Sequence, residues 1–140
     1  DRSVVITGAG SGIGRATALR FASEGASVAC LDLADAVHDT AATIRDAGGS
    51  AVAVAVDVSD EASVAAGVEA AATELGTATI LANVAGVLRF AITHEASVPD
   101  FDLMIAVNLK GPFEMTRQLV RRHLAGRSSR ACSPPVAAPS

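Results

Sequence analysis

The sequence predicts an α/β fold in which helices cover both faces of a parallel sheet. Three observations predict this class. Short apolar runs alternate with segments of helical periodicity through residues 1–126, which is the pattern of βαβ units. Hydrophobic residues make up 50% of the 140 residues and aromatic residues only 3%, so Ala, Val, Leu and Ile must build the core. A glycine follows each of the first three helical segments, where helices commonly end.

The expected elements alternate strictly as far as residue 84. Strands are expected at residues 4–6, 28–33, 51–58 and 79–84, and helices between them at residues 13–24, 35–47 and 60–75. Ser59 or Asp60 is expected to cap the third helix, because either side chain can accept a hydrogen bond from the first helical turn.

Two further helices are expected after the fourth strand. Ser97 can cap a helix that runs to about Leu109, with a proline in its first turn. Gly111 and Pro112 then break or bend the chain, and a last helix covers residues 113–124 and ends at Gly126.

The last part of the chain differs in composition from the rest. Residues 1–114 contain 6 basic and all 15 acidic side chains, whereas residues 115–140 contain 5 arginines and no acid. Three prolines and four serines follow residue 126, with no apolar run long enough for a strand. We therefore expect a domain at residues 1–126 and a disordered or frame-shifted tail, without helix or strand, at residues 127–140.

Composition also excludes several classes of partner. The formal net charge is −4, and no basic stretch is interleaved with aromatic residues, so neither nucleic acid nor a membrane surface is an expected partner. No apolar run is long enough to span a bilayer, and no signal peptide is evident. Two cysteines far apart in sequence, Cys30 and Cys132, favour the reducing cytoplasm over a disulfide framework. The expected partner is a small molecule.

A glycine-rich turn joins the first strand to the first helix. Residues 7–14 read TGAGSGIG, and Gly8, Gly12 and Gly14 fit the spacing GxxxGxG. Glycines let backbone N–H groups approach a pyrophosphate, and a helix N-terminus adds partial positive charge. A generic tight turn would explain the glycines alone, but their place between a strand and a helix favours a dinucleotide site.

This turn resembles the cofactor loop of the short-chain dehydrogenase/reductase family, and three later motifs extend the resemblance to about residue 125. Asp57 and Val58 are similar to the family's adenine-contacting pair, residues 83–86 (NVAG) resemble its Asn-Asn-Ala-Gly motif, and Asn108 matches its helix asparagine, which holds a water in the proton relay. The resemblance implies a Rossmann-like sheet of order 3-2-1-4 and a nicotinamide cofactor. The cofactor-binding residues that we expect are Gly8, Ser11, Gly12, Ile13, Gly14, Asp32, Leu33, Asp57, Val58, Asn83, Ala85 and Gly86, with Asn108 as the catalytic residue and no metal ligand.

Four of these side chains also have a physical interpretation of their own. Asp32 ends the second strand, where a carboxylate can accept hydrogen bonds from both ribose hydroxyls of adenosine and would repel a 2′-phosphate. NAD is therefore favoured over NADP. The alternative is that Asp32 is only a surface residue at a strand end. Asp57 could cap the third helix instead of contacting adenine. The amide of Asn83 can tie neighbouring loops together. Asn108 lies on an apolar helix face, where an unpaired amide costs about 1–3 kcal/mol, so we expect a partner for it.

Other polar residues are weaker candidates. His94 and Glu95 lie in the loop before the Ser97 helix, and His38 and His123 form no metal-ligand spacing with the cysteines. Cys30 is expected inside the second strand. Arg117, Arg121 and Arg122 have helical spacing and are expected to form a solvated face.

The family's catalytic tyrosine and lysine have no counterpart here. The chain contains no tyrosine, its one lysine is Lys110, and no serine follows an apolar strand that would position it. Two functions fit: the cofactor-binding part of an NAD-dependent oxidoreductase acting on an alcohol or ketone, or an inactive dinucleotide-binding fragment or interaction module. The fourth strand is expected to have an unpaired edge, so we expect a homo-oligomer.

Overall fold

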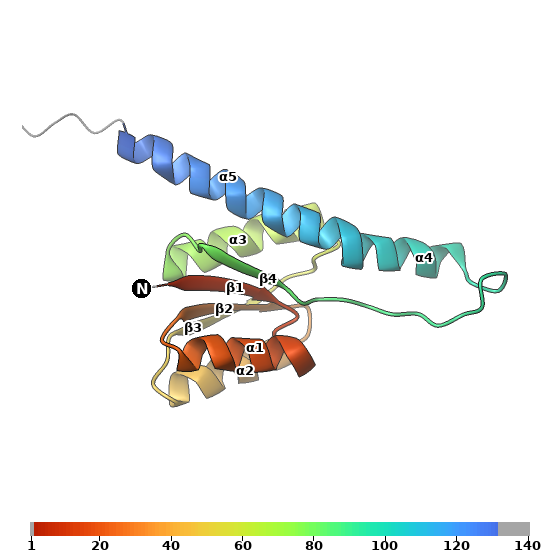
Figure 1. Ribbon diagram of the computed structural model, residues 1–140, viewed down its shortest axis with the longest axis horizontal. Coiled ribbons are helices and arrows are strands. Elements are labelled where there is room, and N and C mark those ends of the chain that lie inside the picture. Colours follow the sequence, from red (N-terminus) through yellow and green to blue (C-terminus); the bar gives the residue numbers. More distant parts are fainter. Residues whose placement is uncertain (1, 132–140) are drawn as a thin grey trace, which may run out of the picture.

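The computed structural model describes residues 2–131, and these form the predicted α/β architecture (Figure 1). Four parallel strands build one sheet in the order β3-β2-β1-β4, as expected. Their bounds are β1 Ser3–Thr7, β2 Ser27–Asp32, β3 Ala51–Ala55 and β4 Ile80–Asn83. β3 is shorter than expected because the chain leaves the sheet after Ala55, although Val56 and Val58 remain buried.

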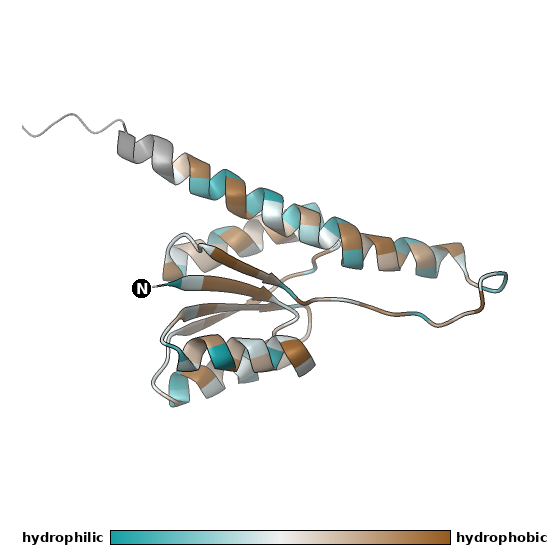
Figure 2. Ribbon diagram, in the orientation of Figure 1, coloured by the Kyte–Doolittle hydropathy of each residue, from teal (hydrophilic) through white to brown (hydrophobic). Residues whose placement is uncertain are grey.

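The central strands β1 and β2 are buried on both faces. Val4 and Ile6 pack into one cluster with α1 (Gly12–Ser23) and α2 (Ala36–Asp46), whereas Val5 and Leu31 pack into the other with α3 (Glu61–Leu75) and α5 (Gly111–Ala131). This division follows the two-residue period of a strand. Figure 2 shows the consequence as a sheet coloured hydrophobic along its length.

Helices α1 (Gly12–Ser23) and α2 (Ala36–Asp46) cover one face of the sheet, and α3 (Glu61–Leu75) and α5 cover the other (Figure 1). Of the two residues expected to cap α3, the structure selects Asp60, whose carboxylate accepts a hydrogen bond from Ser63 N at 2.7 Å. Gly76 ends the helix with φ of +76°, a conformation that glycine adopts without strain.

The segment after Ser97 is one continuous helical rod instead of two separated helices. Ser97 caps α4 (Val98–Ile105), accepting a hydrogen bond from Asp100 N at 3.1 Å. A π-helical turn, η1 (Ala106–Lys110), leads directly into α5 (Gly111–Ala131). The expected break at Gly111 and Pro112 is therefore wrong. Gly111 N–H donates to Ala106 O, five residues back, and this wider turn shifts the hydrogen-bond ladder so that Pro112 neither interrupts it nor collides with it.

The expected end at Gly126 is also wrong, because α5 continues to Ala131. Gly126 does not have the positive φ of a helix-ending glycine. A helical glycine costs only about 1 kcal/mol relative to alanine, and arginine and serine are compatible with a helix. Residues 127–131 thus have helical backbone where no element was expected, and the rest of the expected tail, residues 132–140, lies outside the described residues. Within residues 2–131 no helix is long and apolar enough to cross a membrane.

Candidate functional site

A cleft of about 290 Å³ opens at the carboxyl ends of the strands. The chain order places β2 on one side of β1 and β4 on the other, so the loops after β1 and β4 diverge from the sheet here, the usual location of ligands in open α/β sheets. The cleft is lined by Gly8, Ser11, Asp32, Leu33, Val56, Asp57, Val58, Val84, Ala85, Gly86, Val87 and Val107. Most of the expected cofactor-binding residues are therefore together in one cleft.

Glycines allow the backbone to pack closely beside this cleft. A Cβ on Gly8 would lie 2.8 Å from Ala85 N, and a Cβ on Gly14 would lie 1.9 Å from Gly8 O. Both are shorter than real Cβ contacts, so the loop after β1 sits against α1 and against the β4 loop only because these positions lack side chains. Gly12 differs, because its φ is +49° and the space beside it is open.

Ser11 is the N-cap residue of α1 but does not cap it through its side chain. The hydroxyl is exposed and lines the cleft. The first N–H groups of an α-helix have no partner within the helix, so the first turn of α1 can donate to an anion placed over Gly12.

Asp32 is half-buried at the end of β2, and both of its carboxylate oxygens accept backbone hydrogen bonds. Gly10 N donates to Oδ2 at 2.8 Å and Ala34 N donates to Oδ1 at 3.0 Å. Each carboxylate oxygen has two lone pairs, so both retain capacity to accept from a ligand in the cleft. Asp32 is thus held in one orientation by the loops on either side, which a surface aspartate would not require.

Asp57 does not cap α3, the alternative that the sequence left open. Its Oδ1 accepts hydrogen bonds from Ser59 N at 2.9 Å and Ser59 Oγ at 2.6 Å. Its backbone N–H donates to Ser63 Oγ at 2.9 Å. These contacts fix the turn that follows β3 and place Asp57 on the cleft wall beside Val58.

Asn108 lies in η1 and forms two hydrogen bonds with the backbone of Val87. Val87 N donates to Oδ1 and Nδ2 donates to Val87 O, both at 2.8 Å. The side-chain amide thus forms, with the loop after β4, the pair of hydrogen bonds that the backbone of a neighbouring strand would form. The expected partner of Asn108 exists, but the side chain itself is exposed instead of buried.

The expectation that the amide of Asn83 ties neighbouring loops together is wrong. Its side chain is exposed and forms no hydrogen bond among the described residues. The nearby loops are tied instead by Thr7, whose Oγ1 accepts from Val84 N at 3.1 Å and Ala85 N at 3.2 Å. Thr7 is 2% exposed, and a polar side chain at the last position of a buried strand is the signal that identifies it. Gly12, Ile13 and Gly14 form the first turn of α1 without lining the cleft, and Ile13 is exposed.

The remaining polar candidates lie elsewhere. His94 and Glu95 are exposed, and no group of His, Cys, Asp and Glu within residues 2–131 could hold a metal ion. Cys30 is fully buried in β2, and this burial raises the pKa of its thiol to about 11.

Two of the three arginines expected on a solvated face instead join α5 to α3. Arg117 pairs with the buried Glu114 at 2.7 Å and with Glu61 of α3, and Arg122 pairs with Glu69 of α3. The hydrogen bond to Glu114 raises the pKa of Arg117 above its ordinary value. These pairs hold the rod over the sheet and leave Arg121 exposed.

Known proteins match nearly the whole described chain. A family model for short chain dehydrogenase matches residues 2–131. The chain is 42% identical over 121 residues to D-threitol dehydrogenase of Mycolicibacterium smegmatis, covering 86% of this chain and 46% of that protein. It is 39% identical over 132 residues to cis-4-hydroxycyclohexanecarboxylate dehydrogenase of Sinomonas cyclohexanicum, covering 94% and 53%. The crystal structure of a short chain dehydrogenase from Mycobacterium avium superposes with a TM-score of 0.85 at 37% identity, covering 90% of this chain and 48% of that one. The chain thus spans about half the length of these relatives.

Proposed function

Because this chain belongs to the short-chain dehydrogenase family, we propose that its cleft binds the nicotinamide dinucleotide of an oxidoreductase that acts on an alcohol or a ketone. The observation that carries the proposal is the close packing of backbone at two glycines, directly beside the open N-terminus of α1. Gly8 packs against the backbone of Ala85, and Gly14 packs against the backbone of Gly8. Side chains at these positions would occupy the space of the loop itself, so the glycines form a cradle in which only backbone donors face an anion.

The residues of the cleft fit the parts of such a cofactor. The turn at Ser11 and Gly12, together with the first turn of α1, would hold the pyrophosphate. Asp32 would accept the adenosine ribose hydroxyls, with Leu33, Asp57 and Val58 around the adenine. Ala85 and Gly86 would border the nicotinamide half, and Asn83, Ile13 and Gly14 would support the site. When bound, the nicotinamide would supply or accept the hydride.

Within the dinucleotides, we assign NAD in preference to NADP. The carboxylate of Asp32 lies at the cleft, and the residues expected to flank the ribose, Ser11 and Leu33, bring no positive charge. A 2′-phosphate would therefore meet a like charge with no compensating cation.

Asn108 would act near the reacting groups of the complete protein. Two of its hydrogen-bonding positions are used by Val87, which leaves one lone pair on Oδ1 and one hydrogen on Nδ2. Those positions suit a water in a proton relay. This chain has no tyrosine to pass a proton to substrate, so its own share of the function is cofactor binding. A reducing, cytoplasmic setting agrees with the buried free thiol of Cys30.

A titration with NADH tests the assignment, followed by calorimetry or by the fluorescence of the nicotinamide itself, because the chain contains no tryptophan or tyrosine. In the variant Ser11→Glu, a carboxylate at the N-terminus of α1 would repel the pyrophosphate and leave the fold intact, because the Ser11 side chain makes no cap bond and an acidic group is favourable there. Ser50→Glu is the matched control, an exposed serine at the opposite end of the strands. We expect Ser11→Glu to weaken NADH binding at least tenfold, by analogy with charged contacts of about 1.5–3 kcal/mol, and Ser50→Glu to leave it unchanged. Absence of NADH binding by the folded chain, or an equal effect of both variants, would refute the site.

A further inference from the structure

The first turn of α3 holds the part of the cleft wall that is proposed to face adenine. Asp57 and Val58 line the cleft, and the backbone N–H of Asp57 donates to Ser63 Oγ at 2.9 Å. Ser63 belongs to the first turn of α3, where its own N–H donates to the carboxylate of the cap residue Asp60 at 2.7 Å. A displacement of the amino end of α3 would therefore displace Asp57 as well.

An arginine of α5 is bound to this end of α3. Arg117 pairs with Glu61, the first residue of α3, and with Glu114, one turn earlier in α5. Oε2 of Glu114 accepts hydrogen bonds from Nε of Arg117 at 3.0 Å and from Nη2 at 2.7 Å. Glu114 is buried, and the ring centroid of Phe113 lies 5.9 Å from Cζ of Arg117. The guanidinium therefore has a defined position from which it can hold Glu61.

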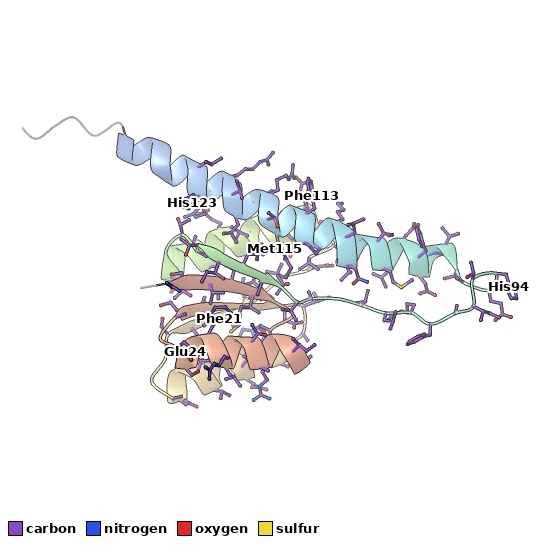
Figure 3. All side chains as sticks on the ribbon, viewed as in Figure 1. Phe21, Glu24, His94, Phe113, Met115 and His123 are labelled. Carbon is purple, nitrogen blue, oxygen red and sulfur yellow. The ribbon has the colours of Figure 1, made fainter. Side chains whose placement is uncertain are left out.

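The start of α5 is itself fixed against the cleft wall. A Cβ on Gly111 would lie 3.1 Å from both Cβ and O of Val58, so the backbone of α5 packs directly on a residue of the cleft. Met115 is fully buried, and Figure 3 shows it pointing from α5 toward the sheet, whereas Phe113 points away. The same segment of α5 thus contacts one residue of the cleft wall directly and holds its neighbour through Arg117 and α3.

A second ion pair joins the same two helices farther from the cleft. Arg122 of α5 pairs with Glu69 of α3, which lies about 12 Å beyond Glu61 along the helix at roughly 1.5 Å per residue. The two glutamates have similar exposure, 57% for the side chain of Glu61 and 63% for that of Glu69. The pairs are alike in chemistry and differ in place, since the Glu61 pair lies beside the residues that hold Asp57.

We propose that Arg117 is a positioning residue for the adenine half of the cofactor, an inference that rests on the function proposed above. Arg117 does not line the cleft. It holds Glu61, which fixes the first turn of α3, and this turn fixes Asp57 beside Val58. The affinity for adenine should therefore depend on an ion pair outside the cleft, because a chain of packed and hydrogen-bonded residues carries a change at one end to the other.

Glu61→Ala tests this role more directly than a change of Arg117, which would leave the buried carboxylate of Glu114 without its partner and destabilise the fold. We expect Glu61→Ala to weaken the binding of NADH and of AMP about three- to tenfold, within the range by which residues away from a ligand alter its affinity. Binding of reduced nicotinamide mononucleotide, which lacks the adenine half, should not change. Glu69→Ala is the matched control, because it removes the second ion pair, and it should leave all three affinities unchanged in calorimetry.

Glu61→Gln separates the contact from the charge. Its side-chain oxygen can still accept a hydrogen bond from Arg117, whereas the negative charge at the amino end of α3 is lost, as it is in Glu61→Ala. Glu61→Gln should therefore recover most of the affinity for AMP. Hydrogen exchange gives a measurement without ligand. The Asp57 amide should exchange faster in Glu61→Ala than in the unchanged chain, and its rate should not change in Glu69→Ala.

Equal losses of AMP affinity in Glu61→Ala and Glu69→Ala, or in Glu61→Ala and Glu61→Gln, would overturn the positioning role. So would an equal loss of affinity for reduced nicotinamide mononucleotide, or an Asp57 amide whose exchange does not respond to Glu61→Ala. In each of these cases a chain that binds NADH leaves the function proposed above intact. If the folded, unchanged chain binds neither NADH nor AMP, the cofactor site itself is refuted, and the positioning role with it.

Discussion

Replacement of Asp32 by alanine should affect two properties that have separate causes: the choice of cofactor and the stability of the empty protein. The carboxylate accepts from Gly10 N and Ala34 N and retains lone pairs toward the cleft. Hydrogen bonds from two ribose hydroxyls to this charged acceptor contribute about 1.5–3 kcal/mol, so Asp32→Ala should weaken NADH binding about 10- to 100-fold.

The same replacement should improve NADPH binding. A phosphate carrying about two negative charges near 4 Å from a carboxylate is repelled by about 2 kcal/mol even at the dielectric constant of water. Removing that repulsion corresponds to about 30-fold in affinity. The ratio of NADPH to NADH affinity should therefore rise by about 300- to 3,000-fold, most clearly at low ionic strength.

The stability effect comes from the loop contacts. Gly10 N is partly buried and loses its acceptor, whereas Ala34 N is exposed and can donate to water. We expect a loss of about 1.5–3 kcal/mol in the free energy of unfolding without cofactor. Asp35→Ala is the matched control, because Asp35 is exposed nearby, carries the same charge and makes no cap bond with its side chain.

Parallel titrations with NADH and NADPH, together with urea unfolding of the apo protein, measure these quantities. An affinity ratio that does not change in Asp32→Ala, or that changes equally in Asp35→Ala, would refute the assignment of Asp32 to the ribose. Tighter binding of NADPH than of NADH by the unchanged chain would refute the preference for NAD.

Three further outcomes are expected. Asn108→Ala should lower the free energy of unfolding by about 1–2 kcal/mol, the net contribution of its two hydrogen bonds to Val87. It should also speed hydrogen exchange at the Val87 amide. An unchanged exchange rate would contradict the hydrogen bond between Val87 N and Asn108. The pKa of the Cys30 thiol is raised to about 11, so the thiol of the unfolded chain loses its proton at a lower pH than the thiol of the folded chain. The free energy of unfolding, measured in urea, should therefore be unaffected by this group below about pH 9 and should fall by about 2–3 kcal/mol as the pH rises to 11. Cys30→Ala should remove this pH dependence. The chain alone should not oxidise alcohols or reduce ketones, because a missing general acid typically costs about 10²–10⁴-fold; NADH absorbance against a panel of carbonyl compounds measures this, and turnover abolished by Asn108→Ala would reveal a site that this interpretation lacks.

The sheet and its covering helices could be predicted because their signals are local. Apolar runs such as the one in β2 and glycines such as Gly76 determine strands and helix ends within a few residues. The continuous rod could not be predicted in the same way. Gly111 and Pro112 are ordinary breaking signals, and only the π-turn before them, stabilised by packing against Val58, makes them compatible with a helix.

The candidate site shows the same difference between local signals and tertiary contacts. The location of Asp32 could be predicted because it ends a strand, but its hydrogen-bond partner Gly10 lies 22 residues away in the sequence. Thr7 acts on a loop 77 residues away, and Arg117 pairs with Glu61 across 56 residues. Such contacts depend on the assembled sheet. Residue type and spacing indicated where the site lies, and the partners that fix each side chain came only from the tertiary structure.

These long-range contacts explain how loops can form a defined cleft. Thr7 holds the β4 loop against β1, Asp32 holds the glycine turn against β2, and Asn108 holds Val87 against the helical rod. In each case a side-chain oxygen accepts a backbone N–H that would otherwise lack a partner in the fold. The loops are therefore ordered before any ligand enters, and a dinucleotide would not have to supply the free energy for ordering them. The same reasoning gives Asp32 and Asn108 two roles each, so that a change at either residue should alter loop order and binding together.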